Sequence, residues 1–570
     1  MHNLTTDKEG VLILVQILKN KGAERVVLSP GSRNAPLTMA FAREKDMKHY
    51  VVVDERSAAF MALGITRQSG RPTVLVCTSG TAALNYAPAI AEAYYQCLPL
   101  IVITADRPSE WIDQEDSQTI RQKDIYRNIV KASFQIPGDI MTEDERWFAE
   151  REINNALNLA LSGRKGPVHI NMPLKEPLYG LHQYTENICR NIEYIPSAES
   201  LPADVVESLA KEFNGYGKIM IIAGFNLPDE KLNDILKRFS LLPQVVILSE
   251  KPSNILSGNI ISTIDRVLST IDEEDYEKFS PDLVISFGGS LISRYLKHFL
   301  RDNPPRTNWY IHRGEIPADT FKSLTRHIDT EPLAFFEAIF RNIAGHESDY
   351  ASIWAGKKEL AAKMHDEYLQ KVSWSDLKAY SMIFPLLPED ISLQLSNSTP
   401  VRYAQLFDLP KFRRIDCNRG TSGIDGCTST AVGASVVNDG TTVLISGDLG
   451  FAYDSNALWN KYITPKFKMI VFKNGGGGIF RFIPGPSELE ELEECFETET
   501  DVDVKGFASL HGFAYFEAGN EKELSEALPE FIKEERKASI LCVVTPKEKN
   551  ASVLRNYFKN YKNHERVENH

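Results

Sequence analysis

Short, continuous apolar runs constrain the fold of this chain more than any other feature. The segments Arg25–Leu28 and Thr73–Cys77 consist mainly of valine and leucine, and each ends in a turn of small and polar residues. Segments with helical spacing, such as residues 11–19 and 82–95, lie between such runs. Strands that are apolar on both faces are typical of a parallel sheet covered by helices on both sides. Ligands bind such sheets at the carboxyl ends of the strands, which is where the polar turns fall.

The same pattern recurs along the 570 residues. Further strand-like runs occupy residues 50–53, 99–104, 218–223, 244–248, 283–287, 391–395, 414–417, 442–446, 468–472 and 539–544. Residues 173–196 show little periodicity, and residues 329–377 have a helical, linking character. The sequence therefore predicts three doubly wound α/β domains, at residues 1–185, 186–375 and 376–570.

Composition excludes several classes of protein. Hydrophobic residues make up 43% and charged residues 25%, as in ordinary globular chains. No apolar run approaches the ~18 residues of a membrane span, and the first residues lack a signal-peptide pattern, so we expect a cytoplasmic protein. The net charge of −13 argues against general nucleic-acid binding. The 7 cysteines form no CxxC pair, which indicates reduced thiols.

Part of the negative charge is local. Residues 488–503 contain only acidic charges, with no lysine or arginine. A run of this kind is typical of a solvated or mobile surface segment. Because it closely follows the glycine run 475–478, a mobile lid is the alternative interpretation.

Two polar motifs follow neighbouring runs in the last third. Asp448 lies in GDLG, and Asn474 begins NGGGGIF. Carboxylate and amide oxygens are ligands that Mg²⁺ accepts, with phosphate and water completing its shell. Glycines let the backbone approach a diphosphate closely. Each motif alone could be a tight turn at a strand end, but their order along the chain favours a metal site.

Charged residues also follow the strands elsewhere. Glu55 ends the apolar run YVVVDE, where burial would raise its pKa and make it a proton donor. The alternative is a first-turn or capping role at a helix that begins near Ser57, for which Asp54 is equally suited. Five arginines follow strand-like runs and would suit a substrate with several carboxylates, although each could form a structural ion pair: Arg33, Arg107, Arg294, Arg402 and Arg419.

The motifs SPGSRNAPLT, DERSAAFMALGI, TSGTA, TADRPSE, SQTIRQ, NRGTSGIDG and GGIF resemble one family closely. It is the 2-succinyl-5-enolpyruvyl-6-hydroxy-3-cyclohexene-1-carboxylate (SEPHCHC) synthase family of the thiamine-diphosphate enzyme superfamily. The resemblance is dense in the first and last thirds and weak in the middle third. It departs from the superfamily at GDL, where most members have GDG, and at Lys473, where many have asparagine. Asn474, the metal-binding residue of that pair, is kept.

The resemblance implies a transferase of menaquinone biosynthesis that acts as a carboligase. 2-Oxoglutarate would lose CO₂ on thiamine diphosphate, and the succinyl carbanion equivalent would add to isochorismate. A homodimer or homotetramer is implied, with the active site between two subunits, and Mg²⁺ or Mn²⁺ as the metal. The alternatives are another thiamine-diphosphate carboligase or decarboxylase for 2-oxoacids, and a non-catalytic ligand-binding member of the fold.

Site residues follow from the resemblance position by position. The metal ligands would be Asp448, Asn474 and the carbonyl of Gly476. Glu55 would hydrogen-bond the aminopyrimidine ring. Other cofactor contacts would be Ser398, Arg419, Gly420, Ile424, Gly447, Leu449, Gly450, Gly477, Ile479 and Phe480. Ser398, Arg402 and Arg419 would handle 2-oxoglutarate. Isochorismate would be bound by Ser32, Arg33, Arg107, Gln118 and Arg294.

Overall fold

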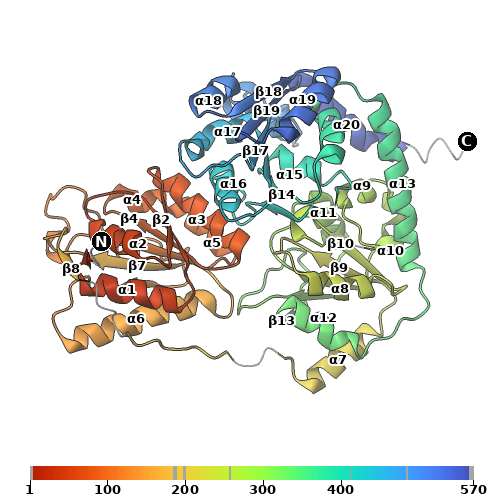
Figure 1. Cartoon of the computed structure of the whole chain (residues 1–570). Coiled ribbons are helices and arrows are strands. Elements are labelled where there is room, and N and C mark those ends of the chain that lie inside the picture. Colours follow the sequence, from red (N-terminus) through yellow and green to blue (C-terminus); the bar gives the residue numbers. More distant parts are fainter. Residues whose placement is uncertain are drawn as a thin grey trace, which may run out of the picture. The chain divides into compact units, whose positions relative to one another are not determined.

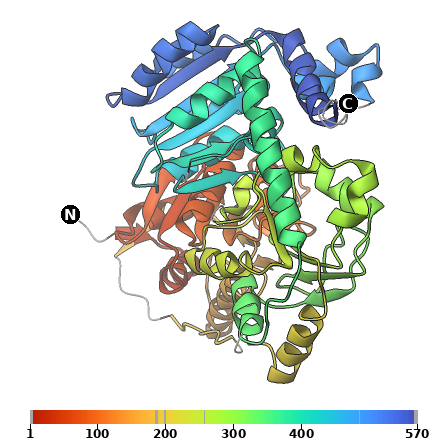
Figure 2. The ribbon, with the colours of Figure 1, turned by 90° about the vertical axis from the view of Figure 1, so that its right-hand side faces the viewer.

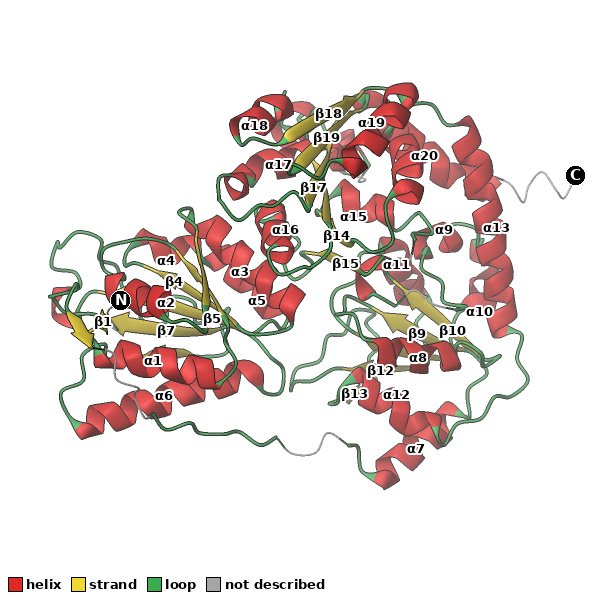
Figure 3. Ribbon diagram, viewed as in Figure 1, coloured by secondary structure: helices red, strands yellow, loops and turns green. Residues whose placement is uncertain are grey.

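The computed structural model describes residues 4–183, 189–196, 200–255, 258–410, 412–482 and 485–563. These residues form three parallel sheets flanked by helices (Figure 3), so the predicted α/β class is confirmed. The chain divides into two compact units: residues 1–196, 418–442 and 453–467 form the first, and residues 197–417, 443–452 and 468–570 form the second. The boundaries of the three expected domains remain a prediction. No disulfide forms and no membrane-spanning helix is present among the residues listed above.

The first unit is built on a six-stranded sheet in the order β3-β2-β4-β5-β7-β6. Its strands are β2 (Arg25–Leu28), β3 (Lys48–Val51), β4 (Thr73–Cys77), β5 (Leu100–Asp106), β6 (Ser133–Gln135) and β7 (Val168–Pro173). Successive side chains of a strand point to opposite faces. Val26 therefore packs with helices α1 (Glu9–Asn20), α2 (Ala35–Arg43) and α6 (Glu143–Leu161), and Val27 with α3 (Glu55–Ser69) and α5 (Ala87–Tyr95) (Figure 1). Burial on both faces explains the continuous apolar runs.

A segment from the last third completes this unit. Helix α16 (Cys427–Ser435) packs against α3 at glycines. A Cβ atom on Gly64 would lie 2.0 Å from the carbonyl oxygen of Thr430, and one on Gly433 would lie 2.1 Å from that of Met61. Neither contact leaves room for a side chain. The helix that begins at Glu55 is therefore held by the segment that follows NRGTSGIDG.

Two further details of the first unit depart from the sequence pattern. The helix expected at residues 82–95 is split into α4 (Thr81–Asn85) and α5, because Pro88 restarts the helix and its ring disfavours a continuous turn. Strands β1 (Leu4–Thr6) and β8 (Leu181–Gln183) form a small antiparallel sheet that no apolar run predicted.

The second unit contains the other two sheets. The five-stranded sheet has the order β10-β9-β11-β12-β13. Its strands are β9 (Ile219–Ala223), β10 (Val245–Ser249), β11 (Leu283–Phe287), β12 (Thr307–Ile311) and β13 (Arg326–Ile328). Helices α7 (Ala203–Phe213), α8 (Glu230–Phe239) and α12 (Pro332–Phe340) pack on one face. Helices α9 (Ile264–Leu268), α10 (Tyr276–Phe279) and α11 (Arg294–Asp302) pack on the other.

The six-stranded sheet of the second unit has the order β15-β14-β16-β17-β19-β18. Its strands are β14 (Ser392–Leu395), β15 (Arg414–Cys417), β16 (Thr442–Gly447), β17 (Phe467–Lys473), β18 (Ala514–Ala518) and β19 (Ser539–Val544). Its helices are α14 (Asp376–Ile383), α15 (Thr399–Ala404), α17 (Asp448–Tyr453), α18 (Val504–Leu510), α19 (Glu521–Lys533) and α20 (Lys547–Asn563). Because β16 and β17 are neighbours, the loops that follow them lie together.

Helix α13 (Tyr350–Lys371) links the two sheets of this unit. It is the long green helix of Figure 2. Trp354 and Met364 of this helix are buried in one hydrophobic core that also contains Val284 of the five-stranded sheet and Ile445 of the six-stranded sheet. The helical segment expected at residues 329–377 is thus an integral part of the core.

Candidate active site

The GDLG and NGGGG motifs meet at the carboxyl ends of β16 and β17. The side chain of Asp448 is buried, at 2% exposure. Its Oδ2 accepts hydrogen bonds from the N–H groups of Asn474 (3.1 Å), Gly475 (2.9 Å) and Gly476 (3.1 Å), and its Oδ1 accepts one from Leu449 (2.8 Å). Burial raises the pKa of Asp448, and these four donors oppose that shift. The carboxylate thus organises the glycine loop.

The donor set of this loop fits a hard divalent cation. Oδ1 of Asp448 accepts a single backbone N–H and keeps acceptor capacity. The carbonyl of Gly476 accepts one N–H, from Gly478 at 2.7 Å. With the side-chain oxygen of Asn474, all candidate ligands are oxygens, as Mg²⁺ prefers. The described part of the chain contains no group of three or more His, Cys, Asp or Glu side chains able to hold a metal.

Gly476 has to be glycine at this position. Its φ of +123° lies in a region that other residues rarely adopt, and a Cβ atom would meet the carbonyl oxygen of Glu497 at 2.7 Å. Glycine is therefore required here by the packing of the loop against residue 497, and the close approach to a diphosphate remains a prediction.

Asp376, which the sequence analysis missed, lies directly behind the loop. Its Oδ2 accepts a hydrogen bond from Nδ2 of Asn474 at 3.0 Å, and its Oδ1 accepts one from Thr545 at 2.5 Å. Burial raises the pKa of Asp376 to about 6. In the sequence it is only an acidic residue in the first turn of a helix, which is a common and uninformative pattern.

Two of the predicted arginines share a cavity of about 900 Å³ in the second unit. Arg294 reaches it from the start of α11 and Arg402 from α15. Ile479, which follows the glycine loop, and Tyr403 contribute to its apolar wall. Arg555 of α20 also lines it and was not among the predicted residues. The cavity combines these cationic groups and apolar walls with two acidic residues, Asp265 and Asp302. The arginines are the groups in it that could bind a small carboxylate.

Ser398 precedes α15 and has an unusual backbone conformation. Its φ of 75° is positive, which is uncommon outside glycine, and it occupies the N-cap position of α15. Such positions persist where the surrounding structure requires them, often at functional sites.

In the first unit, Asp54 rather than Glu55 caps helix α3. Oδ1 of Asp54 accepts the N–H of Ser57 at 2.9 Å. Glu55 is the first residue of the helix and is half-buried, so the expectation of a largely buried carboxylate is met only in part. Burial raises the pKa of the Cys77 thiol, and the nearby charge of Glu55 raises it further. With Asp54 as the cap, Glu55 remains available for another role.

Arg33 and Arg107 lie near each other at the same sheet edge. Burial, and next the charge of Arg107, lower the pKa of Arg33. Arg33 forms an ion pair with Glu176 at 3.2 Å, and Arg107 forms one with Asp116 at 2.9 Å. Both arginines therefore form the structural ion pairs that the sequence analysis gave as the alternative to substrate binding. Two further predicted residues, Ser32 and Gln118, are exposed on loops. The backbone of Gln118 packs closely on Gly80, where a Cβ atom would lie 3.3 Å from the Cα of Gln118.

Glu92 of α5 holds the NRGTSGIDG loop and was also missed from the sequence. Its carboxylate accepts the N–H groups of Gly420 and Thr421, each at 2.7 Å, and the hydroxyl of Thr421 at 2.6 Å. A Cβ atom on Gly420 would lie 2.6 Å from the carbonyl oxygen of Glu92. Ile424 of the same loop is half-buried. The sequence signal that could have indicated this role was a single glutamate within the otherwise apolar helical segment APAIAEAYY.

The predicted site residues thus form two sets. The first unit contains Ser32, Arg33, Glu55, Arg107, Gln118, Arg419, Gly420 and Ile424. The second unit contains Arg294, Ser398, Arg402, Gly447, Asp448, Leu449, Gly450, Asn474, Gly476, Gly477, Ile479 and Phe480.

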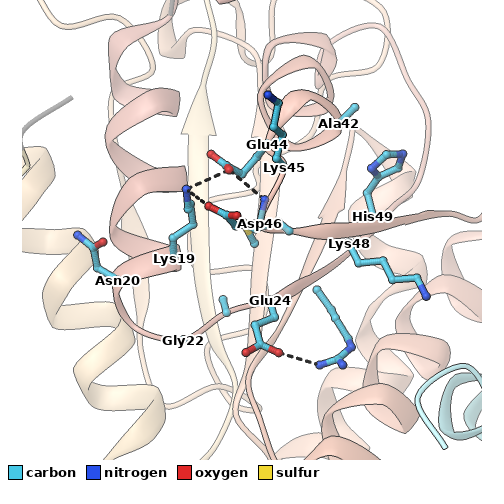
Figure 4. A pocket seen from close by; sticks show the side chains of 13 residues that line it. Lys19, Asn20, Gly22, Glu24, Ala42, Glu44, Lys45, Asp46, Lys48 and His49 are labelled. Atoms are coloured by element: carbon cyan, nitrogen blue, oxygen red, sulfur yellow. Dashed lines mark hydrogen bonds and ion pairs between the residues drawn. The ribbon is translucent and has the colours of Figure 1, made fainter. Parts of the chain in front are cut away.

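Another cavity of about 900 Å³ lies at the opposite edge of the first sheet, by the amino-terminal ends of β2 and β3 (Figure 4). Its charged groups largely neutralise one another. Lys19 pairs with Glu44 at 3.0 Å and with Asp46 at 2.9 Å. It contains none of the predicted site residues.

Comparison with known proteins identifies the family. Residues 8–125 match the N-terminal TPP binding domain of thiamine pyrophosphate enzymes, and residues 399–543 match the C-terminal TPP binding domain. The chain is 45% identical to a SEPHCHC synthase of Porphyromonas gingivalis, with 97% of each chain covered. It is 41% identical to one of Flavobacterium psychrophilum, over 96% of this chain and 98% of the relative. It is 37% identical to one of Bacteroides fragilis, over 98% and 100%. The chain therefore belongs to the SEPHCHC synthase family of thiamine-diphosphate-dependent enzymes.

Proposed function

We propose that this chain catalyses the thiamine-diphosphate-dependent synthesis of SEPHCHC in menaquinone biosynthesis. 2-Oxoglutarate loses CO₂, and the remaining succinyl unit is joined to isochorismate. Family membership supports the reaction class. The observation that carries the substrate assignment is the cavity in which Arg294 and Arg402 stand among apolar walls, because both substrates are dicarboxylates.

The residues of the second unit would hold the metal and the diphosphate. Asp448, Asn474 and the carbonyl of Gly476 bind Mg²⁺ or Mn²⁺, and Gly447, Leu449, Gly450 and Gly477 shape the surrounding backbone. Bound thiamine diphosphate supplies the electron sink that decarboxylation of a 2-oxoacid requires. Ile479 and Phe480 exclude water from the reacting region, which favours loss of a charged carboxylate.

The residues of the first unit would act on the other end of the cofactor. Glu55 would hydrogen-bond the pyrimidine ring of the bound cofactor and hold a proton at its carboxyl oxygen. Its position at the start of α3, with Asp54 as the cap, supports this role. Ile424 supplies an apolar support, and Gly420 allows close approach of the backbone.

The arginines would divide the carboxylates of the two substrates. Arg402, Ser398 and Arg419 bind 2-oxoglutarate. Arg33, Arg107, Arg294, Ser32 and Gln118 bind isochorismate. Planar guanidinium groups match carboxylates with paired hydrogen bonds, and apolar surroundings strengthen those bonds.

We further propose that the protein is a cytoplasmic homo-oligomer, at least a dimer, in which the site forms between two copies. The family resemblance supports this arrangement, and each unit supplies one of the two residue sets. Small molecules are its substrates, and the net charge of −13 supports the expectation that nucleic acid is not a partner.

Mass spectrometry tests the reaction directly. The purified protein is mixed with thiamine diphosphate, Mg²⁺, 2-oxoglutarate and isochorismate. A product that carries the succinyl unit, with loss of one CO₂, is expected. CO₂ from pyruvate without such a product would instead indicate a related 2-oxoacid enzyme. Cofactor binding without any turnover would indicate a non-catalytic ligand-binding protein.

A further inference from the structure

One carboxylate of the acidic segment 488–503 is not on the surface. The side chain of Glu497 is 0% exposed, whereas those of its neighbours Glu493 and Glu499 are 72% and 77% exposed. Burial of a carboxylate is costly unless it is paired. The expectation that this whole segment is a solvated surface is therefore wrong at Glu497.

Glu497 is paired with two cations from separate parts of the chain. Arg481 follows the glycine run, and its Nη2 donates to Oε2 of Glu497 at 2.8 Å while its Nε lies against Oε1. Lys547 begins α20, and its Nζ lies 3.1 Å from Oε2. One buried carboxylate thus holds together the acidic segment, the end of the glycine loop and the last helix.

The backbone of the same residue supports the loop that surrounds Asp448. The N–H of Gly477 donates to the carbonyl oxygen of Glu497 at 2.8 Å. Gly476 fits against that carbonyl with no room for a side chain. The side chain of Lys547 packs over Gly475, the glycine before Gly476. A Cβ atom on Gly475 would lie 3.4 Å from Cδ of Lys547.

These contacts connect Glu497 to the metal ligands through the loop. Gly475 and Gly476 are held by Glu497 and Lys547 on one side, and their N–H groups donate to Asp448 on the other. If the charge of Glu497 is removed, Arg481 and Lys547 are left as two partly buried like charges, whose remaining carboxylate partners, Glu493 and Glu499, are exposed. They would separate, and the loop would lose its support.

We propose that Glu497 is a positioning residue that sets the conformation of the metal-binding glycine loop before cofactor and metal bind. The proposal rests on the proposed function, because it takes Asp448, Asn474 and Gly476 as the metal site. It assigns the acidic segment a supporting role in place of a lid.

Binding of the cofactor to Glu497→Gln tests the proposal. Calorimetry with thiamine diphosphate and Mg²⁺ is expected to give half-saturating concentrations at least roughly tenfold above wild type, as for other residues that orient metal ligands. At saturating cofactor, kcat is expected to stay within about threefold, because Glu497 touches no reacting atom. Hydrogen exchange at residues 474–478 of the cofactor-free protein is expected to accelerate.

Glu493→Gln is the matched control. It removes another partner of Arg481, at 2.8 Å, but from an exposed position. Its effect on both half-saturating concentrations is expected to stay below about twofold, as for exposed ion pairs.

Unchanged cofactor affinity and unchanged exchange in folded Glu497→Gln would overturn the proposal, even if its thermal midpoint falls. If that variant does not fold, Lys547→Gln removes one cation and leaves the pair with Arg481, and it is expected to weaken cofactor binding by a smaller factor. Unaltered binding in Lys547→Gln would then count against the proposal. A wild-type protein that binds no thiamine diphosphate would overturn the proposed function instead.

Discussion

The side-chain amide of Asn474 donates a hydrogen bond of 3.0 Å to Oδ2 of Asp376, which lies 98 residues earlier in the chain. Because the nitrogen is engaged in this bond, the side-chain oxygen is left as the acceptor of Asn474. Asp376 is itself fixed by Thr545. Outer partners of this kind orient a metal ligand and are as important as the ligand in many sites.

Asp376→Asn is expected to weaken Mg²⁺-dependent binding of thiamine diphosphate by ~10–100-fold, because the amide of Asn474 loses its charged acceptor. Calorimetry at several Mg²⁺ concentrations measures the effect. Asp390→Asn, at an exposed position of the same unit, serves as the control and should bind as wild type does. Equal affinities of the two variants would remove Asp376 from the site.

Glu55→Gln and Asp54→Ala are expected to have opposite effects. The first should reduce CO₂ release from 2-oxoglutarate by ~10²–10⁴-fold, because it removes a proton-holding group, and should leave the fold intact. The second should keep turnover but lower the free energy of unfolding by about 1 kcal/mol, because α3 loses its cap. Turnover assays and urea unfolding of both variants measure this. Near-normal turnover of Glu55→Gln would contradict its assigned role.

Mixed oligomers test whether the active site forms between copies. Glu55→Gln and Asp448→Ala alone are each expected to be inactive. In a dimer of one chain of each kind, one of the two sites would contain an intact Glu55 and an intact Asp448. Random reassociation should therefore restore roughly a quarter of the wild-type activity. A mixture that stays inactive, although mass spectrometry shows mixed dimers, would place both residues of a site in the same copy.

Arg33→Ala and Arg402→Ala are expected to separate the two substrates. Loss of a charge-assisted hydrogen bond is worth about 1.5–3 kcal/mol, or roughly 10–100-fold in KM. Arg33→Ala should raise the KM for isochorismate, and Arg402→Ala the KM for 2-oxoglutarate. Steady-state kinetics with one substrate varied at a time measures both. The reverse pattern would mean that the two sides are exchanged.

Asp454 gives a pH dependence of stability. Its carboxylate is fully buried and accepts the N–H and hydroxyl of Ser429, each at 2.6 Å, and burial raises its pKa to about 7. The folded state therefore binds this proton more tightly than the unfolded state. The contribution to stability is fully present below the unfolded pKa of 3.8 and is lost as the pH rises through about 7.

Asp454→Asn should remove this dependence. The free energy of unfolding of wild type, measured relative to the variant, is expected to fall between pH 5 and 7 by at most about 1.4 kcal/mol per pH unit. Urea unfolding at several pH values measures it. A difference that does not change with pH would show that Asp454 stays ionised in the folded protein.

The sequence predicted the central strands and the residues that follow them, because these strands are buried on both faces and leave unbroken apolar runs. β4 and β11 were located with their observed ends. Strand β6 was missed, because its three residues are only partly buried. Strand β12 was also missed, because the polar pair Thr307 and Asn308 interrupts its apolar pattern.

The supporting residues of the site could not be found in the same way. Asp376 has the pattern of a first-turn acid, and Glu497 belongs to an acidic run. Glu92 lies 328 residues from the loop that it holds. Their roles depend on partners that only the folded chain brings near, whereas the glycines and strand-end motifs carry their signal locally.

The packing of α16 on α3 affects the order in which the chain can fold during synthesis. Arg67 of α3 hydrogen-bonds Asn418, which the ribosome adds 351 residues later. Until then, the face of α3 around Gly64 is not covered by α16, although all strands of its sheet have already been made. The nascent chain must keep this face from aggregating while the whole middle third is translated. A shortened gene that ends near residue 185 would leave the same face exposed permanently.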